Sequence, residues 1–259
     1  MSRIFLSLSL LAVVVAFSAC SREDPGFERP VPYFNSINVG ANVTANIRVG
    51  DQRVEVLGDG NLSGIITEVL DDELFIYGAG ASNVIANIWV NDLRQVLGKD
   101  NSRINFPENF VSISPDLNIL GRNASAIRVN QTMVYDSVYV ELRDASNLGV
   151  IDLDSRVLFG DLRNGTRCNI EGFSEHLELI MTDGCRFNLD FPDASYPFIA
   201  PMQSVSCAIT ARNGANAWVF PTDYLNAKVS DGSVVFYKGN PANIDQEVPN
   251  GGQLLTKDN

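Results

Sequence analysis

A tetrapeptide with Asp or Asn at its second position recurs eight times between residues 99 and 252, and this repeat constrains the fold more than any other feature. The third residue is Gly in five of the eight copies. The copies are KDNS at 99, RNAS at 122, RDAS at 143, RNGT at 163, TDGC at 182, RNGA at 212, SDGS at 230 and PNGG at 249. Because Asn, Asp and Gly tolerate left-handed backbone conformations, each tetrapeptide predicts a tight corner.

Side chains at fixed distances from each Asp or Asn form columns of like character. Two residues after it they are small, and six residues before it they are apolar in copies two to eight. The column four residues after it is Ile104, Ile127, Leu148, Cys168, Phe187, Ala217, Val235 and Leu254. The residues between these columns are mostly polar in the middle copies. Alternation with period two indicates strands with one buried face, so each repeat reads as strand, corner, strand, loop.

One repeat of about 20 residues cannot bury its own apolar face, whereas stacked repeats bury a continuous core. The repeat therefore predicts an all-β, single-chain right-handed parallel β-helix (β-solenoid), in which residues 99–259 form the repeat rungs. An antiparallel sandwich is the alternative fold; it explains the alternation but not columns aligned over eight copies. Residues 35–98 repeat more weakly and are expected to supply the first strands and an N-terminal cap.

Stacked rungs would bring equivalent corner residues to roughly 4.8 Å from one another. The corner column alternates strictly between the two residue types: Asp100, Asn123, Asp144, Asn164, Asp183, Asn213, Asp231 and Asn250. An amide between each pair of acids separates the like charges and donates to a carboxylate in a neighbouring rung. We therefore predict a mixed Asp–Asn ladder along one edge.

The N-terminus carries an export signal. Arg3 precedes an apolar run over residues 4–17, which is the length of a signal-peptide core. The sequence FSAC then resembles the lipobox of bacterial lipoproteins, with Phe17 where Leu is usual and Cys20 as the residue that takes the lipid. Residues 1–19 are thus expected to be a signal peptide and residues 20–34 a lipidated tether. Glu23 and Asp24 are similar to the surface-export signal of Bacteroides-group lipoproteins, although a merely solvated linker explains them equally.

The excess of acidic over basic residues limits the classes of partner that the chain is expected to bind. The chain has 19 Lys and Arg against 31 Asp and Glu, a formal net charge of −12. This disfavours nucleic acid and anionic membrane surfaces, so the membrane is expected as a partner through the lipid alone.

Three stretches carry a family resemblance: RVEVLGDGNLSGIITEVLDDELFIYG, the recurring RNAS-like corners, and KVSDGSVVFYKGNP. They resemble the putative auto-transporter adhesin, head GIN domain family of Bacteroides-group secreted proteins and lipoproteins, over roughly residues 35–245. The resemblance implies this fold and a cell-envelope location. It brings no catalytic residues, because the family's motifs are structural.

Residues with the potential for catalysis or metal binding are few. His176 is the only histidine and precedes an inward column residue, so it is expected on the outer face of a strand. Asp71 with Asp72 suggests either calcium or a turn, and Asp152 with Asp154 either calcium or a solvated strand face. No metal or cofactor is expected.

Three cysteines of the mature domain, Cys168, Cys185 and Cys207, fall in inward columns and are expected to be small buried side chains. The first two are one rung apart and two residues out of register. Their Cα atoms are then expected about 8 Å apart, beyond the reach of a disulfide.

Three surface features are candidate sites. The outer face of the middle rungs is polar, at Arg167, Asn169, Glu171, Arg186, Asn188 and Asp190. The outer face of the last rungs is apolar at Trp218, Phe220, Val234 and Phe236, a patch expected to be either covered by the insertion FPDASYPFIAPMQS or used as an interface. Ser137, in Asp-Ser-Val, resembles an O-glycosylation acceptor of Bacteroides-group proteins.

Three function classes remain. The first is an outer-membrane or surface lipoprotein that binds a glycan or protein, as a monomer or an oligomer. The second is a structural envelope lipoprotein that faces the periplasm. The third is a carbohydrate-active enzyme, since polysaccharide lyases use parallel β-helices; these need clustered acids and a proton-abstracting base, whereas the outer charges here are typical of solvated ion pairs. We expect a non-catalytic binding module without a cofactor.

Overall fold

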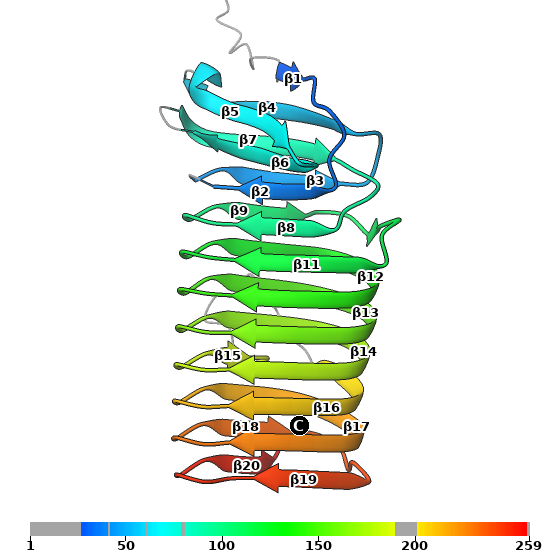
Figure 1. Ribbon diagram of the computed structural model, residues 1–259, viewed down its shortest axis with the longest axis vertical. Helices are drawn as coiled ribbons and strands as arrows, with labels where there is room; N and C mark the ends of the chain where they lie inside the picture. The colour runs from blue at the N-terminus through cyan, green and yellow to red at the C-terminus, as the bar shows by residue number, and fades with distance from the viewer. Residues whose placement is uncertain (1–26, 41, 61, 79–80, 190–200, 258–259) are drawn as a thin grey trace, which may run out of the picture.

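Two sheets of stacked strands run the length of the molecule (Figure 1). The computed structural model describes residues 27–40, 42–60, 62–78, 81–189 and 201–257. In the rungs from residue 95 onward, the chain crosses the front sheet from right to left, turns at the tight corners and returns across the back sheet, which makes the solenoid right-handed. The described residues contain no α-helix, only the 3₁₀ turn η1 (Leu62–Gly64), so none of their helices has the length and apolar character to cross a membrane.

Within each sheet the strands follow one another along the solenoid axis. In that order, the front sheet contains β5 (Ile65–Leu70), β6 (Glu73–Gly78), β2 (Ser36–Val39), β8 (Gln95–Gly98), β11 (Asp116–Gly121), the second halves of β12 (Ala126–Leu142), β13 (Asn147–Leu162) and β14 (Arg167–Met181), β16 (Gln203–Ala211), the second half of β17 (Asn216–Val229), and β19 (Asn243–Glu247). The back sheet contains β1 (Phe27–Arg29), β4 (Arg53–Gly60), β7 (Ala81–Trp89), β3 (Thr44–Arg48), β9 (Arg103–Phe106), the first halves of β12, β13 and β14, β15 (Arg186–Phe187), the first half of β17, β18 (Val234–Tyr237) and β20 (Gln253–Thr256). The short strand β10 (Phe110–Val111) pairs with β12 where that strand bends between the sheets.

The strand register confirms the columns read from the sequence. In the parallel pair of β12 and β13, Ile127 lies opposite Leu148 and Val138 opposite Leu158. These side chains are buried, as are most others at the same offsets. Columns of aliphatic side chains therefore fill the space between the sheets, and the parallel pairing confirms the β-solenoid over the sandwich.

The interior columns also hold the three cysteines. Cys168, Cys185 and Cys207 are buried free thiols, and burial raises the pKa of Cys207 to about 12. Cys168 pairs in register with Phe187, while Cys185 Sγ lies 3.2 Å from Thr166 Oγ1. The predicted two-residue offset between Cys168 and Cys185 is thus confirmed.

Each corner is a tight turn with two left-handed residues. At Asn164 and Gly165 the φ angles are 60° and 71°, and all eight corners have positive φ at both positions. The N–H of Ser146 donates to the carbonyl of Arg143 at 3.2 Å, which closes the turn between the two sheets. The N–H of Gly165 donates to the carbonyl of Asp183 in the next rung at 2.9 Å, so the corners are hydrogen-bonded to one another as well.

The predicted Asp–Asn ladder is present. In each of four rung pairs the Asn side-chain amide donates to the Asp of the preceding rung. The Nδ2 to Oδ1 distances are 2.9 Å for Asn123 to Asp100, 2.8 Å for Asn164 to Asp144, 3.0 Å for Asn213 to Asp183 and 3.3 Å for Asn250 to Asp231. The bond from Asn213 lowers the pKa of Asp183.

The first rungs are stacked out of sequence order. The rung of β2 and β3 lies between the later rung of β6 and β7 on one side and that of β8 and β9 on the other. A ladder of amides follows the spatial order: Asn105 donates to Asn46 at 3.1 Å, Asn46 to Asn87 at 3.0 Å, and Asn87 to Glu55 at 3.0 Å. The chain thus forms the rung of β2 and β3 first and then the rung of β6 and β7 on its outer side. It then passes the first rung and continues on the other side with the rung of β8 and β9.

The outer end is closed by antiparallel pairs. Strand β4 pairs antiparallel with β7, and β5 with β6 through a turn at Asp71 and Asp72, where both φ angles are positive. The acidic pair is therefore a turn. Of the segment expected to be a tether, residues 27–34 instead pack on the domain: β1 pairs with β4, and Phe34 is fully buried.

Replacing Asn164 with Asp tests the ladder. The change places carboxylates in three adjacent rungs, at 144, 164 and 183, and removes the hydrogen bond to Asp144. We expect a modest loss of thermal stability near neutral pH that shrinks in high salt, because salt screens exposed charges. Asn164→Gly, which loses the amide without adding charge, is the control and is expected to show no such salt dependence. An unchanged melting temperature for Asn164→Asp at low salt contradicts the ladder.

Ala145 tests the corner conformation. It occupies the second corner position with φ of 59°, where an L side chain costs about 1–2 kcal/mol. Glycine also makes the unfolded chain more flexible, and this entropy cost offsets part of the strain that is relieved. Ala145→Gly is therefore expected to stabilise the fold by about 0.5–1 kcal/mol. Gly165→Ala is the matched reverse, since a Cβ there meets nothing within 4 Å and only backbone strain is added. Calorimetric melting temperatures should move in opposite directions, and equal shifts of the same sign refute the explanation.

Candidate functional site

The predicted outer polar face is only partly a surface. Asn169 is 4 % exposed and Asn188 is fully buried, which corrects the expectation for both. Strand β15 ends at Phe187, and Asn188 then turns with φ of 52° so that its Oδ1 accepts from the N–H of Ile170 at 2.7 Å. Asn188 therefore caps the backbone of the neighbouring rung. Arg186 is exposed, Arg167 and Glu171 are half-buried, and Asp190 lies outside the described residues.

The predicted apolar patch is contiguous. Trp218 and Phe236 are paired on adjacent strands, and Phe220 and Val234 lie two residues from them on the same strands. All four side chains are half-buried. The Nζ atom of Lys257 lies 4.1 Å from the ring centre of Trp218, so a lysine partly covers the patch. Most of the insertion that was one of the two explanations for the patch, residues 191–200, lies outside the described residues.

The remaining sequence candidates lie on the neighbouring strands β12, β13 and β14. His176 is exposed on the outer face of β14, and its Nδ1 is 2.8 Å from Ser206 Oγ. Asp152 and Asp154 are exposed on β13. Ser137 is half-buried beside Asp136, which forms a two-point ion pair with Arg156. Cys20 lies outside the described residues, among which no group of three or more His, Cys, Asp and Glu is placed to hold a metal.

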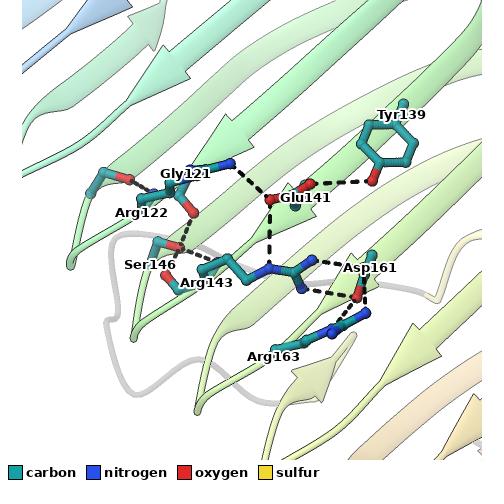
Figure 2. A network of polar contacts seen from close by, with 9 residues as sticks. Gly121, Arg122, Tyr139, Glu141, Arg143, Ser146, Asp161 and Arg163 are labelled. Carbon is teal, nitrogen blue, oxygen red and sulfur yellow. Dashed lines mark hydrogen bonds and ion pairs between the residues drawn. The ribbon is translucent and has the colours of Figure 1, made fainter.

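The front sheet carries a chain of alternating charges beside the corners, which Figure 2 shows. Glu141 Oε1 is 3.2 Å from Arg122 and 3.5 Å from Arg143. Asp161 receives two hydrogen bonds from Arg143, at 2.9 and 2.7 Å, and two from Arg163, at 2.9 and 3.0 Å. We call these five residues the charge ladder.

The charge ladder connects neighbouring rungs through ion pairs and is not a reactive site. Both of its carboxylates form ion pairs with arginine side chains, and Asp161 is buried. The hydrogen bonds from Arg143 lower the pKa of Asp161 and outweigh the effect of burial, which raises it. Asp161 is thus held as an ionised acceptor rather than as a proton donor.

A cleft lies on the opposite edge, where the strands bend between the sheets. We call it the bend cleft; its volume is about 200 Å³, and its lining residues are Tyr33, Phe34, Gly50, Gln52, Val90, Asn91, Asp92 and Ile113. These come from four separate segments: one leads from β1 into β2, and two are the connections from β3 to β4 and from β7 to β8 that the out-of-order rungs make necessary. The fourth is the excursion of residues 107–115 between β9 and β11, which in Figure 1 lies at the right-hand edge of the molecule.

The excursion is fixed in place at several points. Phe110 is fully buried and packs edge-on against Phe106, with ring centres 5.3 Å apart. Glu108 accepts from the N–H of Val49 at 3.2 Å, and Ser112 Oγ accepts from the N–H of Leu93 at 3.0 Å. These contacts attach the excursion to three neighbouring segments of the chain.

Its outward side chains are apolar. Ile113 is 78 % exposed and Val111 is 61 % exposed, the two highest values among large apolar side chains of the described residues. Because Tyr33 on the other side of the bend cleft is exposed as well, these side chains form an exposed apolar group, a feature that marks candidate binding sites.

Asp92 is the polar centre of the bend cleft. Its carboxylate accepts hydrogen bonds from the hydroxyl of Tyr33, at 2.8 Å, and from that of Ser114, and it lies 3.7 Å from Arg94. Burial raises the pKa of Asp92, but these hydrogen bonds and Arg94 outweigh it, so the pKa is lowered. The bond to Asp92 in turn raises the pKa of Tyr33. The cleft therefore holds an ionised acceptor beside an exposed aromatic ring.

The bend cleft was not foreseen from the sequence. Its walls come from the segment with the weak repeat, where spacing does not reveal which rungs are neighbours. One signal was available: the first two corners are 23 residues apart, and the extra residues include VSIS, in which serines alternate with apolar side chains.

The fold and its outer faces define the class of the protein as an all-β solenoid with ladders of polar side chains on its flanks. The chain belongs to the family described as putative auto-transporter adhesin, head GIN domain, whose model matches residues 33–241.

Solved structures from the Bacteroides group are similar in fold. A putative adhesin from Parabacteroides merdae is 16 % identical, with a TM-score of 0.80 over 90 % of this chain and 95 % of that one. A putative lipid binding protein from Parabacteroides distasonis is 12 % identical, with a TM-score of 0.80 over 90 % and 96 %. A putative adhesin from Bacteroides fragilis is 14 % identical, with a TM-score of 0.62 over 90 % and 96 %. No curated protein matches the chain.

Asp161→Asn tests the charge ladder. We expect the free energy of unfolding at neutral pH to fall by about 2 kcal/mol, because hydrogen bonds to a charged group are lost. The folded pKa of Asp161 is lowered, so its contribution is complete above the unfolded pKa and is lost as the pH falls through the folded one. Denaturation curves of the two proteins should therefore converge below the usual Asp pKa of about 3.9. Asp154→Asn, exposed on the same strand, is the control, with a change within about 0.5 kcal/mol; equal effects from both variants argue against a stabilising role for the charge ladder.

Proposed function

We propose that the protein is a non-catalytic binding module that a lipid on Cys20 anchors in the outer membrane, facing the cell surface. The observation that carries the proposal is the bend cleft: a rigid excursion holds Ile113 outward beside the exposed Tyr33 and the ionised Asp92. Such a preformed cleft, with apolar walls and a few polar groups, is suited to binding.

The position of Cys20 agrees with anchoring at the capped end. Six residues separate Cys20 from Phe27, where β1 joins the cap. Fully extended, this segment spans about 25 Å. A lipid at Cys20 would therefore hold the cap near the bilayer and leave the rest of the solenoid to extend away from it.

Two alternatives are weaker. A lyase-type enzyme needs free acids and a base at one place, whereas the acids of the charge ladder and Asp136 are paired with arginine. A structural lipoprotein facing the periplasm does not require a rigid loop with exposed apolar side chains. The putative lipid binding protein from Parabacteroides distasonis raises a lipid as another ligand, yet an ionised carboxylate inside the cleft makes burial of an acyl chain there costly.

Labelling and surface proteolysis of whole cells test the anchor and its orientation. We expect the wild type to incorporate a labelled fatty acid and to be digested by protease added to intact cells. Cys20→Ala should lose the label and leave the membrane fraction, while Cys207→Ala, at a buried core cysteine, should keep it. Digestion only after permeabilisation supports the periplasmic alternative.

The full mature protein is then applied to arrays of glycans and of envelope proteins, and failure to bind on both contradicts a binding function.

A further inference from the structure

We propose that the bend cleft binds a single neutral sugar ring, with the C–H face of the ring against Tyr33 and Ile113 and its hydroxyls toward Asp92 and Asn91. This rests on the proposed binding function and names its ligand class. All four residues line the cleft.

The size of the cleft selects a small ligand. Its volume of about 200 Å³ is below the roughly 300–1,000 Å³ of pockets for drug-sized molecules. A protein partner needs about 800 Å² of buried surface on each side, far more than Tyr33, Val111 and Ile113 present. The cleft alone therefore accommodates one ring, such as the terminal or an internal unit of a glycan.

The chemistry of the walls selects an amphipathic, uncharged ligand. Tyr33 is 52 % exposed and Ile113 78 %, so an aromatic and an aliphatic side chain form the apolar part. Asp92, Asn91 and Gln52 form the polar part. A sugar ring has both characters, since its axial C–H bonds make an apolar face and its hydroxyls surround the rim.

The charge at Asp92 excludes other classes. Its side chain is 20 % exposed and has one nearby cation, Arg94 at 3.7 Å, so an anionic ligand would meet a carboxylate. A bound divalent cation generally needs several oxygen ligands, yet the lining contains one carboxylate, already bonded to Tyr33 and Ser114. Hydroxyl groups donate to such an acceptor without disturbing its charge.

The geometry is fixed before any ligand arrives, which reduces the ordering cost of binding. Ile113 is held by the hydrogen bond from its own N–H to the carbonyl of Asn91, at 3.0 Å. Gln52 is held by its bond to the carbonyl of Phe34, at 2.8 Å, and Tyr33 by its bond to Asp92. Each of these three residues is thus hydrogen-bonded to a residue from another of the segments that line the cleft.

Saturation-transfer NMR on the full mature protein tests the assignment. The probes are methyl glycosides of glucose, galactose, mannose and N-acetylglucosamine, with methyl glucuronide as the anionic comparison. We expect at least one neutral glycoside to bind, with the strongest transfer to protons on one ring face and weaker transfer to the glucuronide. Tyr33→Ala and Ile113→Ser should each weaken binding about tenfold or more, equivalent to about 1.4 kcal/mol.

Two further variants separate the contacts. Tyr33→Phe keeps the ring and loses only the bond to Asp92, so binding should stay within about threefold of the wild type. Asp92→Asn removes the charged acceptor and should weaken binding about fivefold or more. Leu70→Ala, at an exposed apolar side chain in the cap, is the control and should change nothing.

The outcomes distinguish this assignment from the proposed function. Glycan or protein binding on the arrays that Tyr33→Ala and Ile113→Ser leave intact overturns the sugar site and keeps the binding module. Preference for the glucuronide, or equal loss with Leu70→Ala, also overturns the sugar site. No binding to any array overturns both.

Discussion

Hydrogen bonding from rung to rung is the constraint on which the rest of the structure depends. A single rung has two short strands and one exposed apolar face, so it gains nothing until a neighbour lies in register with it. The corners set that register, because the N–H of Gly165 bonds to Asp183 in the next rung and the amide of Asn164 bonds to Asp144 in the previous one. Once the corners are aligned, every inward column and every outward ladder follows.

Alignment also explains why the outer faces carry ladders of paired polar groups rather than isolated ones. A residue at a fixed offset meets its equivalents at the strand spacing, so like charges would repel along the whole flank. The chain resolves this by alternating acid and amide at the corners, acid and arginine in the charge ladder, and by stacking asparagines from Asn105 to Asn87. These outer contacts are therefore consequences of the repeat and carry little information about ligands.

The same physics explains which features of the structure could be predicted from the sequence and which could not. Columns, corners and the Asp–Asn ladder are local features repeated at a period, so the sequence was sufficient to predict them. The position of β6 and β7 outside β2 and β3 is set by which strand edges meet, and spacing along the chain does not encode that choice. The burial of Asn188 depends on β15 ending after two residues, which breaks the alternation at a single position. Asp92, lying in a connection, had no column to mark it.

The same break in order explains why the bend cleft lies where it does. In a regular solenoid each connection runs directly to the next rung, and equivalent loops stack closely. Here the chain must leave β3 outward to β4 and return from β7 past it to β8, so residues 49–52 and 90–94 cross the same edge. The excursion then fills part of this irregular edge, fixed by Glu108 and Ser112, and leaves a hollow that Tyr33 and Ile113 border. The bend cleft thus lies where the periodicity of the repeat is interrupted, whereas the charge ladder and the Asp–Asn ladder lie where the repeat is regular.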